Sequence, residues 1–427
     1  MKVLRVYHAG RDAAHRLREL ALHQAGVDVT LVVPSRWDEG GAQRDLPETP
    51  YRIIELPVRR TGDVNRHRYA DDGRISVLVQ SLKPDVLDLH EEPFSAVSRQ
   101  WLQATPRTTP VVAYSAQNID KRFPPPFAQW ERAALRRLAG LYPCSRQAAS
   151  VLRGKGFAGR LEILPLGIDT TRLTAGSQRH DDPTWTLLLV GRLVPEKGVL
   201  DSVRLLAALA HRVPVRLMVV GRGPAAAAAE HLAQELGVAD RLELIPWVDA
   251  EAMAGHYRSA HVTLVPSSAT RTWVEQFGRV ITEAQAAGSV VVGYASGAIP
   301  EVGGPLAALA TEGDVAGLAG LVSALQADQH RWQRLRAGGL EATATRTWEV
   351  VARRQCELYE AVLAAPGPAA STGRRAAQSE FGPPAQVAGG GRPFALPLLR
   401  EDTVATRALA RMVDVIAVSA TTRAGRR

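Results

Sequence analysis

Short apolar runs alternate with amphipathic stretches along most of the chain. In the first third, the apolar runs that we expect to form strands are residues 3–8, 29–34, 85–90 and 111–115. Helical spacing of apolar positions marks the segments 17–26 and 74–83. Apolar runs of about four to six residues separated by helices are typical of strands buried on both faces. The pattern therefore predicts a mostly parallel sheet covered by helices.

The alternation pauses in a polar, turn-rich stretch after Leu166 and then starts again. In this second part we expect strands at 186–191, 215–221, 242–247, 262–266 and 289–295. The helices expected between them are 197–211, 224–236, 250–258 and 279–287. This order again predicts a doubly wound sheet, so the α/β chain divides into an N-terminal domain over 1–167 and a C-terminal domain over 168–346.

The end of the chain has a different composition. Residues 347–365 have the spacing of an amphipathic helix, whereas 366–427 begin with a run rich in glycine, proline and alanine. Such a run is typical of a flexible linker. The basic tail after it is either a dispensable extension or a basic helix that touches an anionic membrane or a partner.

Charge and cysteine content narrow the setting of the protein. Its 427 residues carry a formal net charge of +9, which suits phosphorylated substrates, nucleic acid or anionic lipid. We expect no nucleic-acid partner, because the arginines are scattered and no basic patch is interleaved with aromatic residues. The two distant cysteines, Cys144 and Cys356, fit a cytoplasmic protein. Since no run approaches about 18 apolar residues, membrane contact would be peripheral, on the inner face of the plasma membrane.

The sequence VGRLVPEKG, residues 190–198, is a candidate anion site. A predicted strand ends at Gly191, and Arg192 and Lys197 follow it. Ligands of open α/β sheets bind at the carboxyl ends of strands. Because arginine forms a bidentate fork to phosphate and lysine is a compact charge, the pair suits a diphosphate. Taken alone, a solvated basic loop is the simpler interpretation, and the GRG step at 221–223 is interpreted as a tight turn into a helix.

A second candidate is WVEQFGRVITEAQAAG, residues 273–288. Gly278 lets backbone amides approach a ligand, and a helix over 279–287 would offer unpaired N–H groups at its start. Glu275 precedes that helix and Glu283 lies within it, so both carboxylates can point to the cleft at the strand ends. Taken alone, the simpler interpretation is that Glu275 is a charged loop residue and Glu283 a solvated helix residue.

The two candidates gain weight in combination. Arg192, Lys197, Glu275 and Glu283 all fall at carboxyl ends of predicted strands in one domain. Cations suit a diphosphate and carboxylates suit sugar hydroxyls. This is how a nucleotide-sugar would be held.

Four motifs together carry a resemblance to a known family. They are VGRLVPEKG, the E-x7-E element EQFGRVITE, the following AQAAGSVVVGYASGAIPEVGG, and CSRQAASVLRGKGFAGRLEILPLGIDTTRL, which cover about 140–305. With them the chain resembles the retaining glycosyltransferases of family 4. The resemblance implies the GT-B architecture of two facing Rossmann-like domains, with a C-terminal helix at 347–365 that crosses back to the N-terminal domain. The tail beyond that helix is extra.

The resemblance also implies roles for individual residues. Arg192 and Lys197 would hold the donor diphosphate. Glu275 would lie near the transferred sugar and Glu283 would bind the ribose, so that Glu275, Arg192 and Lys197 are the expected catalytic residues. The other donor-binding residues implied are Gly191, Gln276, Phe277, Gly278 and Val248.

The N-terminal half departs from the family's pattern, and its acceptor-side candidates are correspondingly different. Where many relatives have a glycine pair after the first strand, this chain has only Gly10. Where lipid-acceptor relatives have a histidine after the strand matching 111–115, it has Gln117 and Asn118. His90, in the run HEEP, is expected in a loop at a strand end, where a hydrogen-bonding role is favoured over a catalytic one.

No metal or cofactor is expected. The nucleotide-sugar is a co-substrate, and the one acidic pair with a DxxD spacing, Asp85 and Asp88, is interpreted as structural because Asp88 falls inside a strand. No side chain presents itself as a covalent nucleophile. The implied mechanism is therefore a front-face displacement in which the departing diphosphate takes the acceptor proton.

The implied activity is that of a hexosyltransferase. It would move a sugar to a hydroxyl of a lipid-linked glycan, a polysaccharide or a small molecule, in the synthesis of cell-surface glycan, exopolysaccharide or glycolipid. Three alternatives stay open at this point: transfer to a small metabolite, a nucleotide-sugar epimerase of similar fold, and a basic nucleic-acid-binding or scaffold protein.

Overall fold

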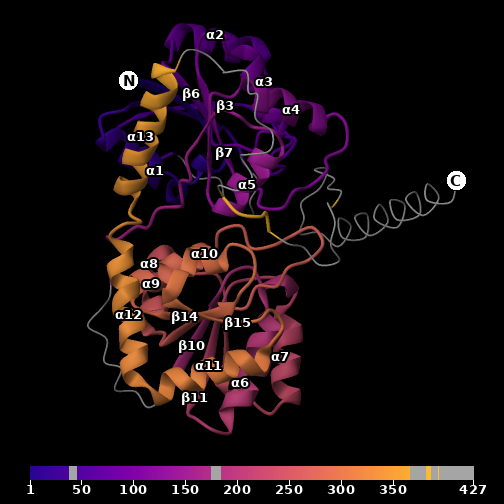
Figure 1. Ribbon diagram of the computed structural model, residues 1–427, viewed down its shortest axis with the longest axis vertical. Coiled ribbons are helices and arrows are strands. Elements are labelled where there is room, and N and C mark those ends of the chain that lie inside the picture. The colour runs from indigo at the N-terminus through magenta and orange to yellow at the C-terminus, as the bar shows by residue number, and fades with distance from the viewer. Residues whose placement is uncertain (38–45, 175–183, 366–380, 386–392, 394–427) are drawn as a thin grey trace, which may run out of the picture. The chain divides into compact units, whose positions relative to one another are not determined.

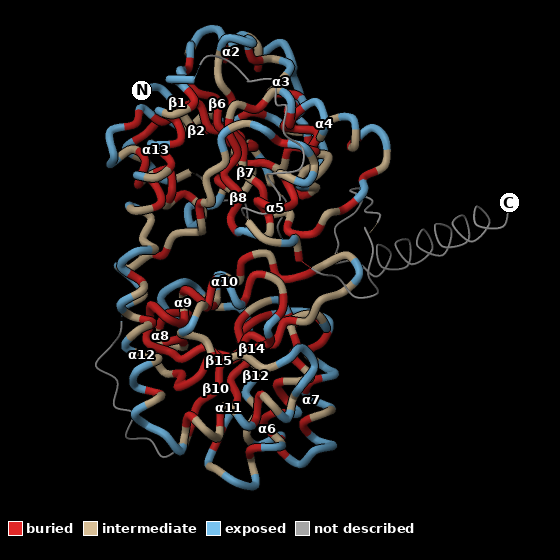
Figure 2. Tube along the Cα trace, in the orientation of Figure 1, coloured by how far each residue is buried: buried red, intermediate tan, exposed pale blue. Residues whose placement is uncertain are grey.

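The computed structural model describes residues 1–37, 46–174, 184–365, 381–385 and 393. The chain forms two compact units. The N-terminal unit contains Met1–Leu164 and the chain from Ala352 to the end of the last described helix, and the C-terminal unit contains Pro165–Val351. In each unit the strands are buried and the outer turns of the helices are exposed (Figure 2).

The N-terminal unit is built on a seven-stranded parallel sheet with the order β3-β2-β1-β6-β7-β8-β9. The strands are β1 (Lys2–Val6), β2 (Asp28–Pro34), β3 (Arg52–Leu56), β6 (Val86–Leu89), β7 (Val111–Ser115), β8 (Gly140–Pro143) and β9 (Arg160–Leu161). A separate antiparallel pair consists of β4 (Val58–Arg59) and β5 (Arg68–Tyr69). The helices are α1 (Leu17–Gln24), α2 (Asp72–Leu82), α3 (Ala96–Ala104), α4 (Phe127–Arg137) and α5 (Arg146–Gly154), with short 3₁₀ turns at Ala9–Arg11 and Ala13–His15.

The C-terminal unit is built on a six-stranded parallel sheet with the order β12-β11-β10-β13-β14-β15. The strands are β10 (Trp185–Val190), β11 (Val215–Val220), β12 (Leu242–Ile245), β13 (Val262–Val265), β14 (Val290–Tyr294) and β15 (Ala307–Ala310). The helices are α6 (Val199–Ala210), α7 (Ala226–Glu235), α8 (Ala250–Ser259), α9 (Arg279–Ala287), α10 (Ile299–Gly303), α11 (Val315–Ala327) and α12 (Gln329–Thr343). Short 3₁₀ turns lie at Pro195–Lys197, Ala239–Arg241 and Gly304–Leu306.

Helices cover both faces of the C-terminal sheet. The helices α6, α7 and α11 pack as one group, and α8, α9 and α12 as another, on opposite sides of the strands in Figure 1. The sheet buries side chains on both faces, because its strands are continuous apolar runs such as residues 185–190, all of which are buried. The predicted α/β class with two Rossmann-like sheets is confirmed.

Both sheets reverse their strand order beside their first strand. In the N-terminal sheet the chain adds strands on one side of β1 and then continues with β6 on the other side. In the C-terminal sheet the same reversal lies between β10 and β13. Ligands of doubly wound sheets bind outside the carboxyl ends of the strands at this switch point. The fold therefore predicts one ligand-binding position in each unit, at the switch point of its sheet.

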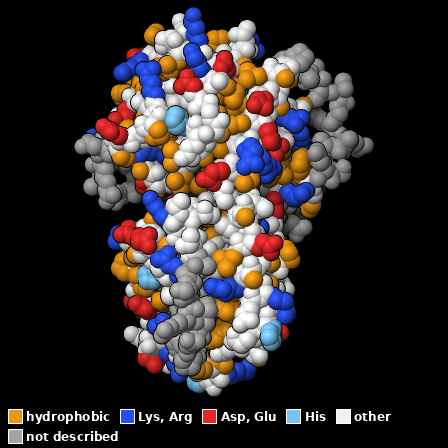
Figure 3. Space-filling view, turned by 90° about the vertical axis from the view of Figure 1, so that its left-hand side faces the viewer, with side chains coloured by type: hydrophobic (Ala, Val, Ile, Leu, Met, Phe, Trp, Pro, Cys, Tyr) orange, Lys and Arg blue, Asp and Glu red, His pale blue; other side chains and the backbone are white. Residues whose placement is uncertain are grey.

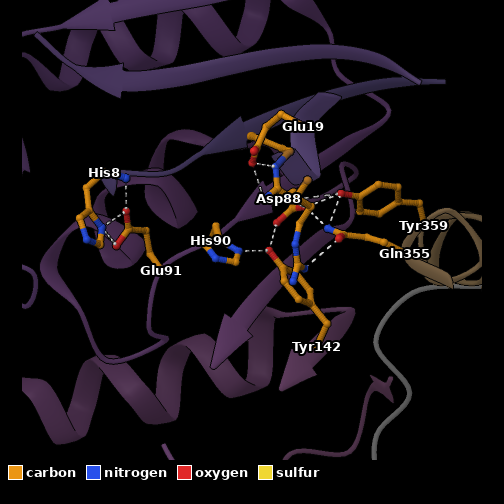
Figure 4. A network of polar contacts seen from close by, with 10 residues as sticks. His8, Glu19, Asp88, His90, Glu91, Tyr142, Gln355 and Tyr359 are labelled. Atoms are coloured by element: carbon orange, nitrogen blue, oxygen red, sulfur yellow. Dashed lines mark hydrogen bonds and ion pairs between the residues drawn. The ribbon is translucent and has the colours of Figure 1, made fainter. Parts of the chain in front are cut away.

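The last helix of the described residues, α13 (Trp348–Ala364), joins the N-terminal unit from Ala352 onward. There its Gln355 donates to Asp88 Oδ2 at 2.7 Å and its Tyr359 hydroxyl donates to the same carboxylate (Figure 4). Asp88 also pairs with Arg5, whose guanidinium lies 2.8 Å from Glu19. All of these side chains are buried. The structural interpretation of Asp88 is therefore confirmed, since the carboxylate fixes α13 against the sheet.

Charge is mixed on the surface shown in Figure 3. Lysine and arginine side chains alternate there with aspartate and glutamate, among scattered hydrophobic side chains. On this face the basic charge is thus distributed among acidic groups. Among the described residues, no helix is both long and apolar enough to span a bilayer.

Candidate active site

A lysine and a glutamate meet at the switch point of the C-terminal sheet. Lys197 Nζ lies 2.6 Å from Glu275 Oε2, and the Ser267 hydroxyl donates to the same oxygen at 3.1 Å. The Lys197 ammonium also lies 5.0 Å from the centre of the Trp273 ring. Glu275 is buried, with 9% of its side chain exposed, whereas 23% of the Lys197 side chain is exposed. Lys197 is thus a partly exposed cation that pairs with a buried carboxylate.

The loops after β10 and β13 touch, and this contact brings the pair together. Gly198 has φ +69°, and a Cβ at this position would overlap with the carbonyl oxygen of Pro266. Next to it, the backbone N–H of Ser268 donates to the carbonyl of Glu196 at 2.9 Å. Only glycine combines this φ with so close an approach of two backbones. The sequence Glu-Lys-Gly therefore seats Lys197 against the loop that carries Glu275.

A third loop, after β14, holds the backbone of Glu275. The N–H of Ala298 donates to the Glu275 carbonyl at 3.0 Å, and Gly297 has φ +53°. A Cβ on Gly297 would lie 2.5 Å from that carbonyl oxygen. Gly297 and Ala298 belong to the motif AQAAGSVVVGYASGAIPEVGG, so this part of the family motif fixes the backbone of Glu275 directly.

The start of α9 follows as predicted. The helix spans Arg279–Ala287, with Gly278 at its N-cap at φ +78° and Gly288 at its C-cap at φ +82°. Just before the helix, Phe277 is buried and Gln276 is half-buried. The amides at the start of α9 have no side-chain cap among the described residues. A helix start of this kind favours an anion.

Glu283 lies one turn inside α9 and has two partners. The hydroxyl of Tyr257, on α8, donates to Glu283 Oε2 at 2.8 Å, and Arg279 Nε lies 3.2 Å from Oε1. Burial, and then the charge of Glu283, raise the pKa of Tyr257 well above its ordinary value. The phenol therefore remains a donor, and it orients the Glu283 carboxylate.

The other donor-side candidates lie on neighbouring strand-end loops. Gly191 follows β10 with φ +143°, and Arg192 is exposed on the same loop. Val248 is half-buried after β12, next to the exposed Trp247. The Gly221-Arg-Gly223 turn after β11 is structural, as predicted, because a Cβ on either glycine would overlap with the backbone of the β10 loop.

The acceptor-side candidates all lie in the N-terminal unit. Gly10 is buried in a 3₁₀ turn after β1, where a Cβ would lie 3.2 Å from the Tyr7 ring. Gln117 is half-buried after β7, and Asn118 is buried and donates to Gln147 at 3.4 Å.

His90 is a buried hydrogen-bonding residue at the end of β6. Its Nδ1 lies 3.1 Å from the Tyr142 hydroxyl, which donates to Asp88 Oδ1 at 2.5 Å (Figure 4). Burial, and then the charges of Arg18 and Arg5, lower the pKa of His90 well below its ordinary value. Because the Tyr142 proton is already committed to Asp88, the neutral ring of His90 donates from Nδ1. Its Nε2 is therefore the acceptor nitrogen.

Several side chains at the two switch points were not singled out from the sequence. In the C-terminal unit these are Ser267, Tyr257 and Trp273, which hold Glu275, Glu283 and Lys197. In the N-terminal unit they are His8, His67 and Glu91, which form one cluster. A signal did exist for two of them, since His8 follows β1 and Glu91 follows β6, the two strands at the reversal.

The two Rossmann-like α/β sheets define the fold of the chain as GT-B. Solved structures support the fold. Sucrose-phosphate synthase from Thermosynechococcus elongatus matches with a TM-score of 0.65 and 19% identity, covering 86% of this chain and 100% of that one. Anabaena HepE in complex with UDP and glucose matches with a TM-score of 0.63 and 15% identity, covering 84% of this chain and 100% of that one.

Within that class, the chain belongs to glycosyltransferase family 4. The sequence model described as Glycosyltransferase Family 4 matches residues 18–172, and the one described as Glycosyl transferases group 1 matches residues 172–341. The first covers most of the N-terminal unit. The second covers all the donor-side residues discussed above, from Gly191 to Glu283.

Curated relatives match over part of their length. D-inositol 3-phosphate glycosyltransferase of Geodermatophilus obscurus is 33% identical over 260 residues, which is 56% of this chain and 55% of that protein. A GDP-mannose-dependent alpha-(1-6)-phosphatidylinositol monomannoside mannosyltransferase of Mycolicibacterium smegmatis is 32% identical over 192 residues, 40% of this chain and 49% of that protein. The chain thus spans about half the length of the curated relatives it matches.

Proposed function

We propose that the protein is a retaining hexosyltransferase that moves a sugar from a nucleotide-sugar to a hydroxyl acceptor. The observation that carries this proposal is the Lys197–Glu275 pair at the switch point of the C-terminal sheet. The names of the relatives, which are glycosyltransferases and mannosyltransferases, support it.

The donor would be held by charge and by backbone dipoles. Lys197 and Arg192 would bind the diphosphate, and the N-terminus of α9 would face it with its backbone N–H groups. Gly278 at that helix start leaves room for a close approach. Since these groups can balance the diphosphate charge, the proposal requires no metal ion at the donor.

The two carboxylates would bind sugar hydroxyls at different places. Glu275, held by Ser267 and by the Ala298 amide, would lie beside the transferred sugar. Glu283, oriented by Tyr257, would accept hydrogen bonds from the ribose. A carboxylate that is already fixed by the protein loses little freedom when it binds a ligand, and such preorganisation improves both affinity and catalysis.

The chemical step would be a front-face displacement. The bond between the anomeric carbon and the diphosphate oxygen breaks, and the acceptor oxygen bonds to the same face of that carbon. The acceptor proton passes to the departing diphosphate oxygen, so configuration is retained. Lys197 would stabilise the charge that develops on the diphosphate, which is the kind of contribution worth about 3 kcal/mol per donor group.

The acceptor class follows from the relatives' names and is part of the proposal. Those names specify inositol phosphate and a phosphatidylinositol mannoside. Both present a cyclic polyol hydroxyl next to a phosphate. We propose a hydroxyl acceptor of this chemistry, as in glycolipid synthesis.

A donor screen followed by product analysis tests the proposal. UDP-, GDP- and dTDP-sugars are compared by thermal shift, and the stabilising donor is then incubated in labelled form with inositol 3-phosphate or phosphatidylinositol mannoside. The proposal predicts an acceptor-dependent product with the donor's anomeric configuration. A product of inverted configuration would contradict retention, and no transfer from any stabilising donor would contradict the activity with these acceptors.

The same experiment separates transfer from epimerisation. An epimerase changes the sugar of the donor without an acceptor. A changed sugar nucleotide in the reaction that lacks acceptor would therefore favour the epimerase, whereas an unchanged donor favours the transferase.

A further inference from the structure

Two histidines and a glutamate converge at the switch point of the N-terminal sheet. β1 and β6 are parallel neighbours with Val6 opposite Leu89, and His8 and Glu91 lie two positions beyond these partners. His67 reaches the same place from the segment before β5. The three ligand atoms lie within 4.8 Å of one another.

The contacts within the cluster are short and mostly buried. His8 Nδ1 lies 2.8 Å from Glu91 Oε1 and 2.9 Å from Oε2, and the His8 backbone N–H donates to Oε1 at 2.8 Å (Figure 4). His67 Nε2 lies 3.9 Å from the same Oε1. The exposed fractions of the side chains are 15% for His8, 2% for Glu91 and 0% for His67.

His67 is the observation that points to a ligand. Its Nδ1 lies 3.1 Å from the backbone carbonyl of Asp63, which can only accept, so this nitrogen carries the proton. The Nε2 of the neutral ring is then a lone pair, buried, with no hydrogen-bond partner among the described residues. It faces a carboxylate oxygen that can only accept as well. Glu91 Oε1 is already hydrogen-bonded to His8, so the buried lone pair of His67 Nε2 is the group that lacks a donor, which is unfavourable unless a positive group reaches it.

The dimensions fit a small divalent cation. Zn²⁺ binds histidine nitrogen and carboxylate oxygen at about 2.0–2.2 Å, and neighbouring ligand atoms of a tetrahedral site are then roughly 3.4 Å apart. The distances of 2.8 and 3.9 Å to Glu91 Oε1 bracket this value. The hydrogen bond from His67 Nδ1 to a carbonyl is the arrangement that orients metal-binding histidines. Imidazole with carboxylate favours Zn²⁺ and similar transition ions over Mg²⁺ or Ca²⁺.

We propose that His8, His67 and Glu91 form a binding site for a divalent transition cation of the Zn²⁺ type. Three protein ligands are the number that catalytic zinc sites use, where a water or a substrate oxygen completes the shell. A cation here would present a Lewis acid at the switch point of the N-terminal sheet. No spacing along the chain predicts this site, because positions 8, 67 and 91 come from three separate segments.

Trp37 provides a local reporter for the site. Its ring lies 4.7 Å from the His8 ring and 4.9 Å from the His67 ring, measured between centroids. A paramagnetic ion bound to these imidazoles quenches tryptophan emission at such a distance. The quenched component would be missing in Trp37→Phe, which separates this site from the other tryptophans.

The test is metal binding by the full chain, without any nucleotide-sugar present. Protein stripped with a chelator and desalted is titrated with Co²⁺ and then with Zn²⁺, and bound metal is counted by mass spectrometry after a second desalting. The variants are Glu91→Gln, His67→Gln and His8→Gln. The matched control is His231→Gln, which breaks an exposed His–Glu pair with 3.5 Å between Nε2 of His231 and Oε1 of Glu235.

We expect one equivalent of Zn²⁺ in the wild type and in His231→Gln, with a rise in Tm on adding metal. Each ligand variant should weaken binding by more than the roughly 10- to 100-fold that loss of an outer-shell partner costs. Co²⁺ should quench a component of the emission that Trp37→Phe lacks.

Two results would overturn the site. One is less than a fifth of an equivalent of Zn²⁺ retained by the wild type at micromolar free metal. The other is equal retention by the wild type and His8→Gln. His8 decides the matter if the buried variants fail to fold, because its ring is the most exposed of the three. Neither result depends on glycosyl transfer, so failure of the cation site and failure of the proposed function are distinguishable.

Discussion

Lys197 Nζ and Glu275 Oε2 lie 2.6 Å apart although 78 positions separate the two residues in the chain. Each follows one of the two strands between which the C-terminal sheet reverses its order. The contact depends on a glycine that lets two strand-end loops touch, and on a third loop that holds the Glu275 backbone. The pair is thus a product of the fold, at the place where doubly wound sheets bind ligands.

Substitution of either member should abolish transfer while the fold persists. Lys197→Ala and Glu275→Gln should each lower kcat/KM by at least about 100-fold, because the diphosphate and the sugar each lose a charged partner. Steady-state assays with the donor found in the screen measure this. The matched control is Lys155→Ala in the N-terminal unit, where Lys155 Nζ lies 2.6 Å from Glu131 Oε1. Normal turnover by Lys197→Ala or Glu275→Gln would remove them from the site.

Two glycines with the same φ separate backbone strain from loop contact. Gly198 and Gly237 have φ +69° and +67°, but a Cβ on Gly198 would overlap with Pro266, whereas one on Gly237 meets nothing within 4 Å. Gly237→Ala should cost about 1–2 kcal/mol of unfolding free energy, the usual cost of this backbone region. Gly198→Ala should cost at least about 3 kcal/mol and weaken donor binding as well. Equal losses in urea denaturation would show that the loop contact contributes nothing.

The two aspartates of the DxxD spacing should differ sharply in stability. Asp88 is buried with Arg5, Tyr142 and α13, whereas Asp85 is exposed and accepts one bond from the Lys2 backbone at 2.7 Å. Asp88→Asn breaks a buried ion pair and should cost about 3–5 kcal/mol. Asp85→Asn should cost no more than about 1 kcal/mol. Thermal unfolding of both variants checks this, and similar Tm values would contradict the account of how α13 is fixed.

Titration of Glu92 should lower the free energy of unfolding as pH rises from acid to neutral. Burial raises its pKa from 4.5 to about 7, against the opposing hydrogen bonds from the Ala116 amide and the Ser115 hydroxyl. Between these two values the folded carboxyl keeps a proton that the unfolded chain has released. The free energy of unfolding therefore decreases as pH rises through this window, by roughly 1–3 kcal/mol from this group.

Glu92→Gln removes that contribution. In urea denaturation at pH 5 and pH 8, the free energy of unfolding should decrease less between the two pH values in the variant than in the wild type. An unchanged difference between pH 5 and pH 8 would show that Glu92 does not titrate in this range.

Much of the fold was predictable because the strands are buried on both faces. Such strands are continuous apolar runs, and the prediction for 111–115 matches β7 at both ends. The prediction for the helix 279–287 matches α9 in the same way, since Gly278 and Gly288 punctuate it. The expected helix at 197–211 was wrong at its start. Pro195–Lys197 is a 3₁₀ turn, and α6 begins at Val199 after the left-handed Gly198.

The candidate site could be predicted only in part. Glu275 and Lys197 could be predicted as site residues because each is a charged residue that follows an apolar run, and this order is seen in the sequence itself. Ser267, the partner of Glu275, comes from the loop after β13, and Tyr257, the partner of Glu283, comes from α8; no spacing links either residue to its glutamate. His67 is a still clearer case, because it reaches Glu91 from a segment with no periodic pattern.

We propose that Lys197 and Glu275 form a donor site. Calorimetric titration of UDP and GDP into the wild type, Lys197→Ala and Lys155→Ala tests it most directly, because it measures diphosphate binding without the acceptor. We expect that one of the two nucleotides binds to the wild type and to Lys155→Ala, and binds at least about tenfold more weakly to Lys197→Ala. Equal affinity of the wild type and Lys197→Ala for that nucleotide would contradict it.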